Sequence, residues 1–145
     1  MTRSQIMARI GPKDTKPELV IRKGLHRIGY RFRLHQRHLP GKPDLVLPRF
    51  RAVIFVHGCF WHAHCGCRYF RYPKTRTDFW HDKLNRNVER DAEAQAELIS
   101  GGWRVLTVWE CATRNVEPEV LCSTIANWLN AGNVSGEIPS SSANT

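Results

Sequence analysis

The stretch His57-Gly-Cys-Phe-Trp-His-Ala-His-Cys-Gly-Cys67 contains three of the seven histidines and three of the five cysteines of the chain. An apolar run with the composition of a buried strand, Ala52-Val-Ile-Phe-Val56, leads directly into it. A second apolar segment, Asp44-Leu-Val-Leu47, lies shortly before this run and follows Pro43. Two short apolar runs joined by a tight turn are typical of a hairpin, so we predict one that brings Asp44 and His57 to the same edge of a sheet.

Helix and strand signals flank this hairpin. Thr15-Lys-Pro-Glu18 fits a capping box that opens a helix ending at Gly29, with Leu19, Val20, Leu25 and Ile28 on its buried face. Later signals predict a half-buried strand at 30–34, a helix from Thr77 or Asp78 to about Ser100, an apolar strand at 103–109 and a helix at 118–129. The order α-β-β-β-α-β-α predicts an α/β protein in which helices flank a mixed central sheet.

Composition limits the class of protein and its partners. A chain of 145 residues, 41% of them hydrophobic, is long enough for one domain with a proper core. Its 22 basic residues against 13 acidic ones favour a polyanion as partner, although a basic surface can also be indifferent. The sequence has neither an apolar run of membrane length nor a secretory signal. We therefore expect a cytoplasmic protein whose reduced cysteines bind metal rather than form disulfides.

The domain organisation is expected to be simple. Residues 1–131 form a single domain that begins with a short basic arm at residues 1–11. Residues 132–145 are rich in Ser, Asn and Gly and are expected to be a disordered tail. Because no heptad repeat or large apolar face indicates an oligomer, we expect a monomer.

Asp44 is the first candidate for chemistry. A carboxylate that follows proline at the start of a strand is often only a turn cap. Here the hairpin places it beside residues 56 and 57, so its oxygens and a main-chain carbonyl of the next strand can bind Mg²⁺. Mg²⁺ on a scissile phosphate activates water and stabilises the leaving oxygen, as hydrolysis of a phosphodiester requires.

This spacing resembles a degenerate PD-(D/E)xK core of the restriction endonuclease type. Pro43-Asp44 fits the first half of that motif, but Phe55-Val56-His57 stands where an acidic residue and a lysine are expected. His57 and His62 are therefore candidates for proton transfer, and either could instead be a zinc ligand or a structural histidine. Asp91 either turns inward and fixes one tautomer of a histidine or belongs to an ordinary helix surface.

Four residues fit a structural zinc site of the Cys₃His type: Cys59, His64, Cys67 and Cys111. A closed set of this kind leaves no open position for a substrate. Cys65 is an alternative to Cys67, since either thiol could reach the metal. Cys122, on the last helix, is expected to be a buried free thiol.

Aromatic and basic residues surround these candidates. Phe60 and Trp61 lie between two ligands, and Trp80 opens the long helix. Aromatic side chains beside a basic groove can stack on bases or wedge into a duplex, although each of them could belong to the core. Two consecutive aromatics cannot easily both point inward, which favours the exposure of at least one.

Several segments closely resemble the very-short-patch repair endonucleases, namely Thr15-Lys-Pro-Glu18, Leu39-Pro-Gly-Lys-Pro-Asp44, Val53-Ile-Phe-Val-His-Gly-Cys-Phe-Trp-His62, Lys74-Thr-Arg, Phe79-Trp80, Asn87-Val-Glu-Arg-Asp91 and Val108-Trp-Glu-Cys111. That prokaryotic family nicks DNA immediately 5′ of the thymine in a T·G mismatch left by deamination of 5-methylcytosine. The resemblance implies the same reaction on double-stranded DNA here. It also implies functional coupling to a cytosine-5 methyltransferase and to mismatch-repair proteins.

The resemblance further implies roles for individual residues. The implied Mg²⁺ ligands are Asp44 and the main-chain carbonyl of Val56. The implied general base is His62, supported by Asp91, with His57 and Glu18 in the same active site. The implied ligands of the structural Zn²⁺ are Cys59, His64, Cys67 and Cys111. The implied DNA contacts are the intercalating Phe60, Trp61 and Trp80, the basic Lys74 and Arg76, and Arg3 and Met7 of the N-terminal arm.

Overall fold

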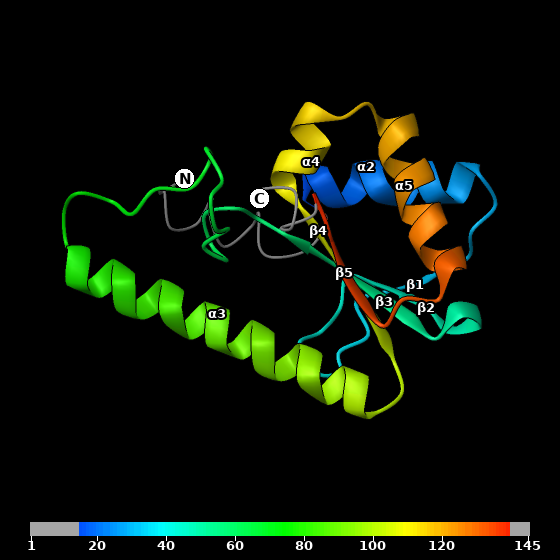
Figure 1. The fold of residues 1–145 in the computed structure, drawn as a ribbon, viewed down its shortest axis with the longest axis horizontal. Helices are drawn as coiled ribbons and strands as arrows, with labels where there is room; N and C mark the ends of the chain where they lie inside the picture. Colours follow the sequence, from blue (N-terminus) through cyan, green and yellow to red (C-terminus); the bar gives the residue numbers. More distant parts are fainter. Residues whose placement is uncertain (1–14, 140–145) are drawn as a thin grey trace, which may run out of the picture.

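The structure, a computed structural model, describes residues 15–139 of the chain. In chain order, its elements are α2 (Lys16–Arg27), β1 (Arg33–Leu34), β2 (Leu45–Leu47), the short 3-10 helix η1 (Pro48–Phe50), β3 (Ala52–His57), α3 (Thr77–Ser100), β4 (Arg104–Trp109), α4 (Glu110–Asn115), α5 (Pro118–Ala131) and β5 (Ser135–Ile138). Figure 1 shows their arrangement, in which the long helix α3 runs along one side of the molecule.

The strands form one mixed sheet in the order β1-β2-β3-β4-β5. The first three strands pair antiparallel, whereas β3, β4 and β5 run parallel to one another. The predicted hairpin is confirmed, with Leu45 opposite Ile54 in β2 and β3. His57 and Trp109 are paired at the C-terminal ends of the parallel strands β3 and β4, so the loops that follow both strands begin at the same end of the sheet.

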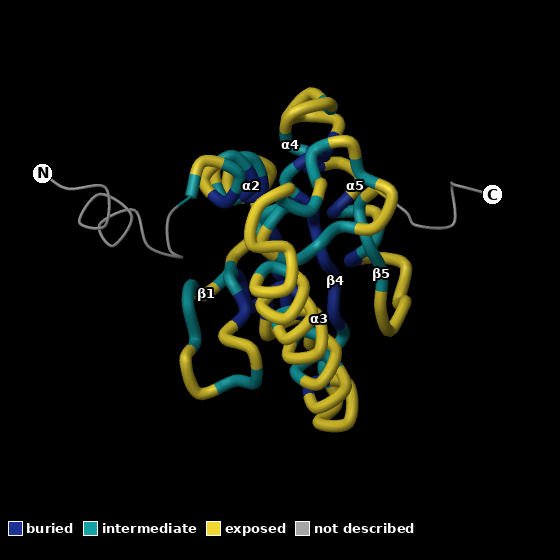
Figure 2. Tube along the Cα trace, turned by 90° about the vertical axis from the view of Figure 1, so that its left-hand side faces the viewer, coloured by how far each residue is buried: buried dark blue, intermediate teal, exposed yellow. Residues whose placement is uncertain are grey.

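Helices cover both faces of this sheet (Figure 1). On one face, Ile21 of α2 and Ile125 of α5 belong to a core cluster with Ile54 and Leu106 of the sheet. On the other face, Leu98 of α3 belongs to a second cluster with Phe55 and Val105. Figure 2 shows the burial that results, with β4 buried between the layers and the outer side of α3 exposed. The predicted α/β architecture, a mixed sheet flanked by helices, is confirmed.

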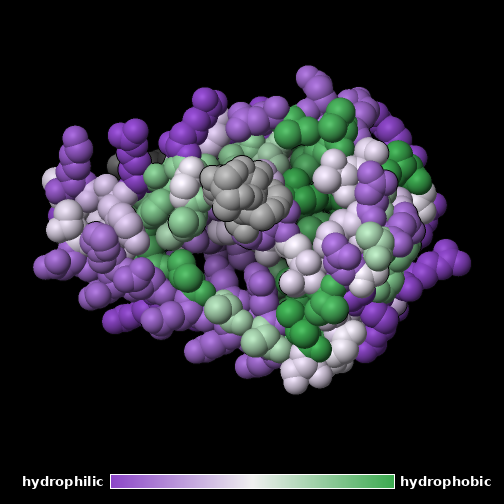
Figure 3. Space-filling model, in the orientation of Figure 1, coloured by the Kyte–Doolittle hydropathy of each residue, from purple (hydrophilic) through white to green (hydrophobic). Residues whose placement is uncertain are grey.

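The surface is divided in a similar way. In Figure 3, hydrophilic residues line the side of the molecule along which α3 runs, and hydrophobic residues gather over the end formed by α4 and α5. The loop between β1 and β2 packs directly on α3, because a Cβ atom on Gly41 (φ 73°) would lie 2.7 Å from the Cβ of Ala94. Glycine at this position therefore allows the loop that ends at Asp44 to pass close to the helix.

Some expectations about the elements are wrong. A disordered tail is expected from residue 132, but Ser135–Ile138 forms the strand β5, which pairs with β4. This pairing satisfies backbone groups of β4, and a strand can do so without an apolar side-chain pattern. In α2, Leu19 and Ile28 are exposed, and the buried positions are Glu18, Ile21 and Leu25. These three face the sheet because they are spaced by three and four residues.

The helix starts also refine the predictions. Thr15 is the N-cap of α2, as expected, but it makes no side-chain capping hydrogen bond. The N-cap of α3 is Arg76, with φ of 51°, in place of the expected Thr77 or Asp78. The predicted arm at residues 1–11, with Arg3 and Met7, lies outside the described residues. Within residues 15–139, no helix has the length and apolar character needed to span a membrane.

Candidate active site and metal centre

Asp44 lies where the hairpin geometry predicts it, beside the end of β3. Its Oδ2 atom accepts a hydrogen bond of 2.7 Å from the backbone N–H of Val56. Burial raises the pKa of Asp44 to about 7, and the nearby Glu18 carboxylate also raises it, while the hydrogen bond from Val56 acts in the opposite direction. Two carboxyl groups side by side in a partly buried site favour the binding of a cation between them.

Glu18 is part of this acidic site. Its side chain is 1% exposed, with Oε2 located 3.0 Å from Nε2 of His35 and 3.3 Å from Nη2 of Arg22. One ligand atom each from Glu18, His35 and Asp44 lies within 4.8 Å of the others. His35 adopts φ of 49°, a backbone conformation that is uncommon for a residue with a side chain. Sequence reasoning overlooked His35, because its approach to Glu18 depends on contacts between separate elements.

His62 and Asp91 form the second part of the site. Nδ1 of His62, in the loop after β3, lies 2.6 Å from Oδ2 of Asp91 on α3. Both side chains are partly exposed, at 27% and 26%. Of the two alternatives for Asp91, the inward orientation is therefore the one observed. A carboxylate at this distance orients the ring and keeps a proton on Nδ1, which leaves Nε2 able to accept one.

His57 stacks on His62. The two imidazole rings are parallel within 3°, and their centroids lie 3.8 Å apart. Burial lowers the pKa of His57 to about 3, an effect strengthened by the neighbouring His62, so this ring is neutral near pH 7. Imidazole lone pairs lie in the ring plane, so the lone pairs of two parallel stacked rings lie in two separate planes that do not meet. One ligand atom each from His57, His62 and Asp91 lies within 4.8 Å of the others, but the parallel stacking of the two rings disfavours joint binding of one metal ion by both histidines.

The four predicted zinc ligands meet in space. One ligand atom each from Cys59, His64, Cys67 and Cys111 lies within 4.8 Å of the others. Cys59 and Cys111 are buried, and burial raises the pKa of both thiols above the ordinary value for cysteine. Cys65, the alternative ligand, is exposed and is not a member of this group. A compact set of one imidazole and three thiols could hold a metal ion, and it is of the kind that structural zinc sites use.

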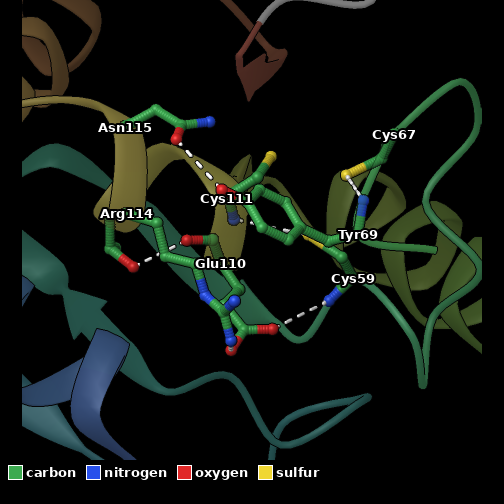
Figure 4. Close-up of polar contacts among 8 residues, drawn as sticks. Cys59, Cys67, Tyr69, Glu110, Cys111, Arg114 and Asn115 are labelled. Atoms are coloured by element: carbon green, nitrogen blue, oxygen red, sulfur yellow. Dashed lines mark hydrogen bonds and ion pairs between the residues drawn. The ribbon is translucent and has the colours of Figure 1, made fainter.

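Polar contacts attach the Cys59–Cys67 loop to α4, as Figure 4 shows. Glu110 accepts hydrogen bonds from the backbone N–H of Cys59 at 3.4 Å and from Arg114 at 3.0 Å. The hydroxyl group of Tyr69 donates to Asn115 at 3.2 Å. Cys111 itself donates its backbone N–H to the sulfur of Cys59 at 3.3 Å. Hydrogen bonds therefore connect this region to α4 in addition to any metal ion bound by the four residues.

The aromatic residues expected to contact DNA form one cluster. Phe60 lies against both Trp61 and Trp80, at centroid distances of 5.2 and 5.4 Å. Trp61 is 44% exposed, as expected for at least one of two consecutive aromatics. Lys74 and Arg76, in the segment that leads into α3, are also exposed. The aromatic cluster is continuous with the site because Trp61 precedes His62 in the loop.

Two cavities reach the histidine pair from either side of α3. The larger one, of about 1080 Å³, is bounded by residues of β5 and of the loop after Cys59. The smaller one, of about 380 Å³, is bounded by Arg37, Lys42 and Arg90. His57, His62 and Asp91 line both. The proposed proton-transfer group is therefore reachable from outside.

Comparisons with known proteins identify relatives of the chain. The family model described as DNA mismatch endonuclease Vsr matches residues 1–68. The DNA mismatch endonuclease Vsr of Escherichia coli is 44% identical over 94% of this chain and 89% of its own length. The type II nicking enzyme V.XorIIP of Xanthomonas oryzae pv. oryzae is 51% identical over 75% of this chain and 79% of its own length. V.NmeAIP, a type II nicking enzyme of Neisseria meningitidis, is 44% identical over 78% and 80% of the two chains.

The α/β sheet, the acidic and imidazole groups at one of its edges and these relatives define the class: the chain is a DNA endonuclease and therefore a hydrolase. It belongs to the DNA mismatch endonuclease Vsr family, as an identity of 44% over nearly the whole of both chains shows. The predicted family is thus confirmed.

Proposed function

We propose that this protein nicks one strand of double-stranded DNA on the 5′ side of the thymine in a T·G mismatch, by Mg²⁺-dependent hydrolysis of a phosphodiester. The observation that carries the proposal is the position of Asp44, His62 and Asp91 at one edge of the sheet, directly beside the exposed Trp61. The groups that could hydrolyse a phosphodiester therefore lie next to an aromatic side chain that could stack on a base. The relatives named as a mismatch endonuclease and as nicking enzymes support the same reaction.

The acidic site has the ligands that Mg²⁺ prefers. Asp44 and the main-chain carbonyl of Val56 would bind the ion, with Glu18 close enough to bind its water ligands. The raised pKa of Asp44 fits this role, because a divalent cation would favour the ionised form that burial disfavours. When bound, Mg²⁺ would polarise the scissile phosphate and stabilise the charge on the leaving oxygen. In this respect, the site would correspond to a PD-(D/E)xK core that lacks both its second acidic residue and its lysine.

His62 would carry out the proton transfer, because the chain has no lysine at the corresponding position of the motif. Asp91 keeps the proton on Nδ1, so Nε2 takes a proton from the water that attacks phosphorus. His57 stays neutral and packs against the His62 ring, which limits the rotation of that ring. The base, its carboxylate partner and the stacked ring come from a loop, a helix and a strand, so the fold pre-organises the site before DNA binds.

The second metal centre is proposed to be structural. Cys59, His64, Cys67 and Cys111 would bind one Zn²⁺ in a closed tetrahedral set. Burial raises the pKa of Cys59 and Cys111, and a bound cation would favour the thiolate forms that burial disfavours. His64 also stacks on Trp109, with parallel rings at 4.0 Å, so its ring orientation is fixed by the sheet.

DNA is proposed to bind across the aromatic cluster. Phe60, Trp61 and Trp80 would stack on or intercalate between bases beside the mismatch, while Lys74 and Arg76 contact phosphates. A formal net charge of +9 supports binding to the backbone of any sequence. Arg3 and Met7 of the N-terminal arm are proposed as further contacts. The active unit is proposed to be a monomer of one domain, coupled in the cell to a cytosine-5 methyltransferase and to mismatch-repair proteins.

The proposed reaction is tested by nicking of end-labelled duplexes that contain either T·G or matched C·G in the same flanking sequence, with Mg²⁺ and with EDTA. We expect a Mg²⁺-dependent cut in one strand, 5′ of the mismatched thymine. Equal nicking of both duplexes would indicate a different restriction-like or structure-specific nuclease. Flanking sequences are varied as well, because the contacts that read them are not defined by the mismatch.

Asp44→Ala separates an enzyme from a DNA-binding module with an inactive nuclease site. We expect this variant to bind the T·G duplex with an affinity within about threefold of the wild type and to lose cleavage by at least about 100-fold. A normal cleavage rate in Asp44→Ala would show that the assignment of the Mg²⁺ site is wrong. Wild-type protein that binds but does not cut any duplex would support the inactive module.

A further inference from the structure

Helix α3 contacts the loop after β3 at two consecutive residues. Nδ2 of Asn87 donates a hydrogen bond of 2.8 Å to the backbone carbonyl of Trp61. One turn further along the helix, Asp91 lies 2.6 Å from the ring of the next residue, His62. Residues four apart lie on the same side of a helix, so one face of α3 fixes both positions.

The loop combines internal hydrogen bonds with these contacts to α3. Its backbone turns back on itself through hydrogen bonds from His62 N–H to the Gly58 carbonyl and from Ala63 N–H to the Phe60 carbonyl. Ala63 adopts φ of 48°, a conformation that residues with a side chain rarely adopt. Trp61 is 44% exposed, so burial alone does not fix the orientation of its side chain. The Asn87 hydrogen bond acts on the backbone of this exposed residue.

The same helix also carries part of the aromatic cluster. Trp80, whose ring centroid lies 6.0 Å from that of Trp61, is seven residues before Asn87 on α3. Trp80, Asn87 and Asp91 therefore lie along one face of the helix, where they contact the ring of Trp61, the carbonyl of Trp61 and the ring of His62. A movement of the Trp61 carbonyl relative to α3 also displaces the backbone N–H of His62, because both groups belong to one planar peptide unit.

We infer that Asn87 is a positioning residue that couples the contact of Trp61 with DNA to proton transfer by His62. The inference rests on the proposed function and goes beyond it. When the Trp61 ring stacks at the mismatch, the loop keeps the position defined by the hydrogen bond from Asn87. His62 then stays aligned with the scissile phosphate. On a matched duplex that does not accept the ring, the displaced loop moves the base out of line. Displacements of about 1 Å are enough to slow such a step.

The test is Asn87→Asp, which keeps the shape of the side chain and replaces the N–H donor by an oxygen that repels the carbonyl of Trp61. We expect kcat/KM on the T·G duplex to fall roughly tenfold, as the loss of a hydrogen bond and the new repulsion together predict. The preference for T·G over C·G should fall by a similar factor. Asn85→Asp is the matched control, because Asn85 is an exposed residue of the same helix and undergoes the same change in charge. It should stay within about twofold of the wild type.

A second variant distinguishes coupling from a loss of structure. In a Trp61→Ala background, adding Asn87→Asp should leave the remaining mismatch preference unchanged, because the group that senses the mismatch is already absent. The thermal midpoint of each variant shows whether it is folded, and Asn87→Ala repeats the test without a new charge. If Asn87→Asp or Asn87→Ala slows nicking of the T·G and C·G duplexes by the same factor, or slows nicking of neither duplex, the coupling role of Asn87 is wrong. The wild-type enzyme is assayed before any variant is made. If it shows no preference for the mismatch, the proposed function is wrong, and this result is distinct from a failure of the Asn87 inference.

Discussion

The carboxylate of Asp44 accepts a hydrogen bond from the backbone N–H of Val56 at 2.7 Å, in the same strand end whose carbonyl is proposed to bind Mg²⁺. One interaction thus joins the two proposed metal ligands across the hairpin. It opposes the effect of burial, which raises the pKa of Asp44 to about 7. The proposed metal site is therefore balanced between its protonated and ionised forms near physiological pH.

Asp44→Asn should reveal this balance as a pH-dependent change in stability. A raised pKa in the folded state means that folding favours the protonated form, so its contribution is complete below the ordinary value of 3.8 and is lost as the pH rises to about 7. The asparagine variant does not lose stability in this way, because its side-chain amide does not titrate. In thermal unfolding without added Mg²⁺, the variant should gain stability relative to wild type between pH 5 and pH 8. Added Mg²⁺ should stabilise only the wild type, and a pH-independent difference would contradict the prediction.

Asp91→Asn should slow the chemical step with little change in DNA affinity. The amide of asparagine can present its N–H to Nδ1 of His62, which would favour the wrong tautomer of the ring. We expect kcat to fall roughly 100-fold in single-turnover nicking, within the range that general base catalysis contributes. Asp82→Asn, at an exposed position of the same helix, is the matched control and should retain its rate. A wild-type rate in Asp91→Asn would remove Asp91 from the proposed mechanism.

Cys111→Ser should release zinc, whereas Cys65→Ser should not. Cys111 is buried among the four proposed ligands, and Cys65 is exposed outside them. Zinc content measured on the purified proteins should be close to one ion per chain for the wild type and for Cys65→Ser, and well below that for Cys111→Ser. The thermal midpoint should fall in the Cys111 variant, since binding of a structural metal contributes to folding. Retention of zinc by Cys111→Ser would show that the ligand set is wrong.

Trp61→Ala should lose preference for the mismatch. The ring is exposed and adjoins Phe60 and Trp80, so its removal changes a surface proposed to stack on bases and leaves the core intact. We expect a cost of about 1–3 kcal/mol in binding to the T·G duplex, the value usual for stacking of one base on an aromatic ring. Trp61→Phe keeps an aromatic face and should recover part of this loss in a fluorescence titration. Unchanged affinity and preference in Trp61→Ala would contradict the proposed DNA contact.

Much of the fold and of the candidate site could be predicted from local patterns. The hairpin follows from two apolar runs separated by a turn, and it is sufficient to place Asp44 beside Val56. The spacing of Cys59, His64 and Cys67 indicates a metal loop before any tertiary contact is known. Cys111 could be added because parallel strands from an α/β pattern end at the same edge of a sheet.

Other features depend on contacts between distant segments and have little local signal. Ser135-Gly-Glu-Ile138 has no strong strand pattern, and it becomes β5 because β4 provides a backbone to pair with. Glu18 fits a capping box in the sequence, yet in the structure its carboxylate is buried against His35. Asn87 likewise reads as a helix surface residue, and only the path of the loop after β3 brings Trp61 to it.

The strand β5 sets a limit on how far the chain can be shortened. Glu137 accepts a hydrogen bond of 2.9 Å from the indole N–H of Trp109, and Trp109 in turn stacks on His64. A version of the chain that ends at residue 131 would therefore lose support for His64, a proposed zinc ligand. It would also turn β4, which is buried at five of its six residues, into an open edge that can pair with other molecules. We therefore expect the last strand to keep β4 from pairing with other molecules as well as to complete the sheet.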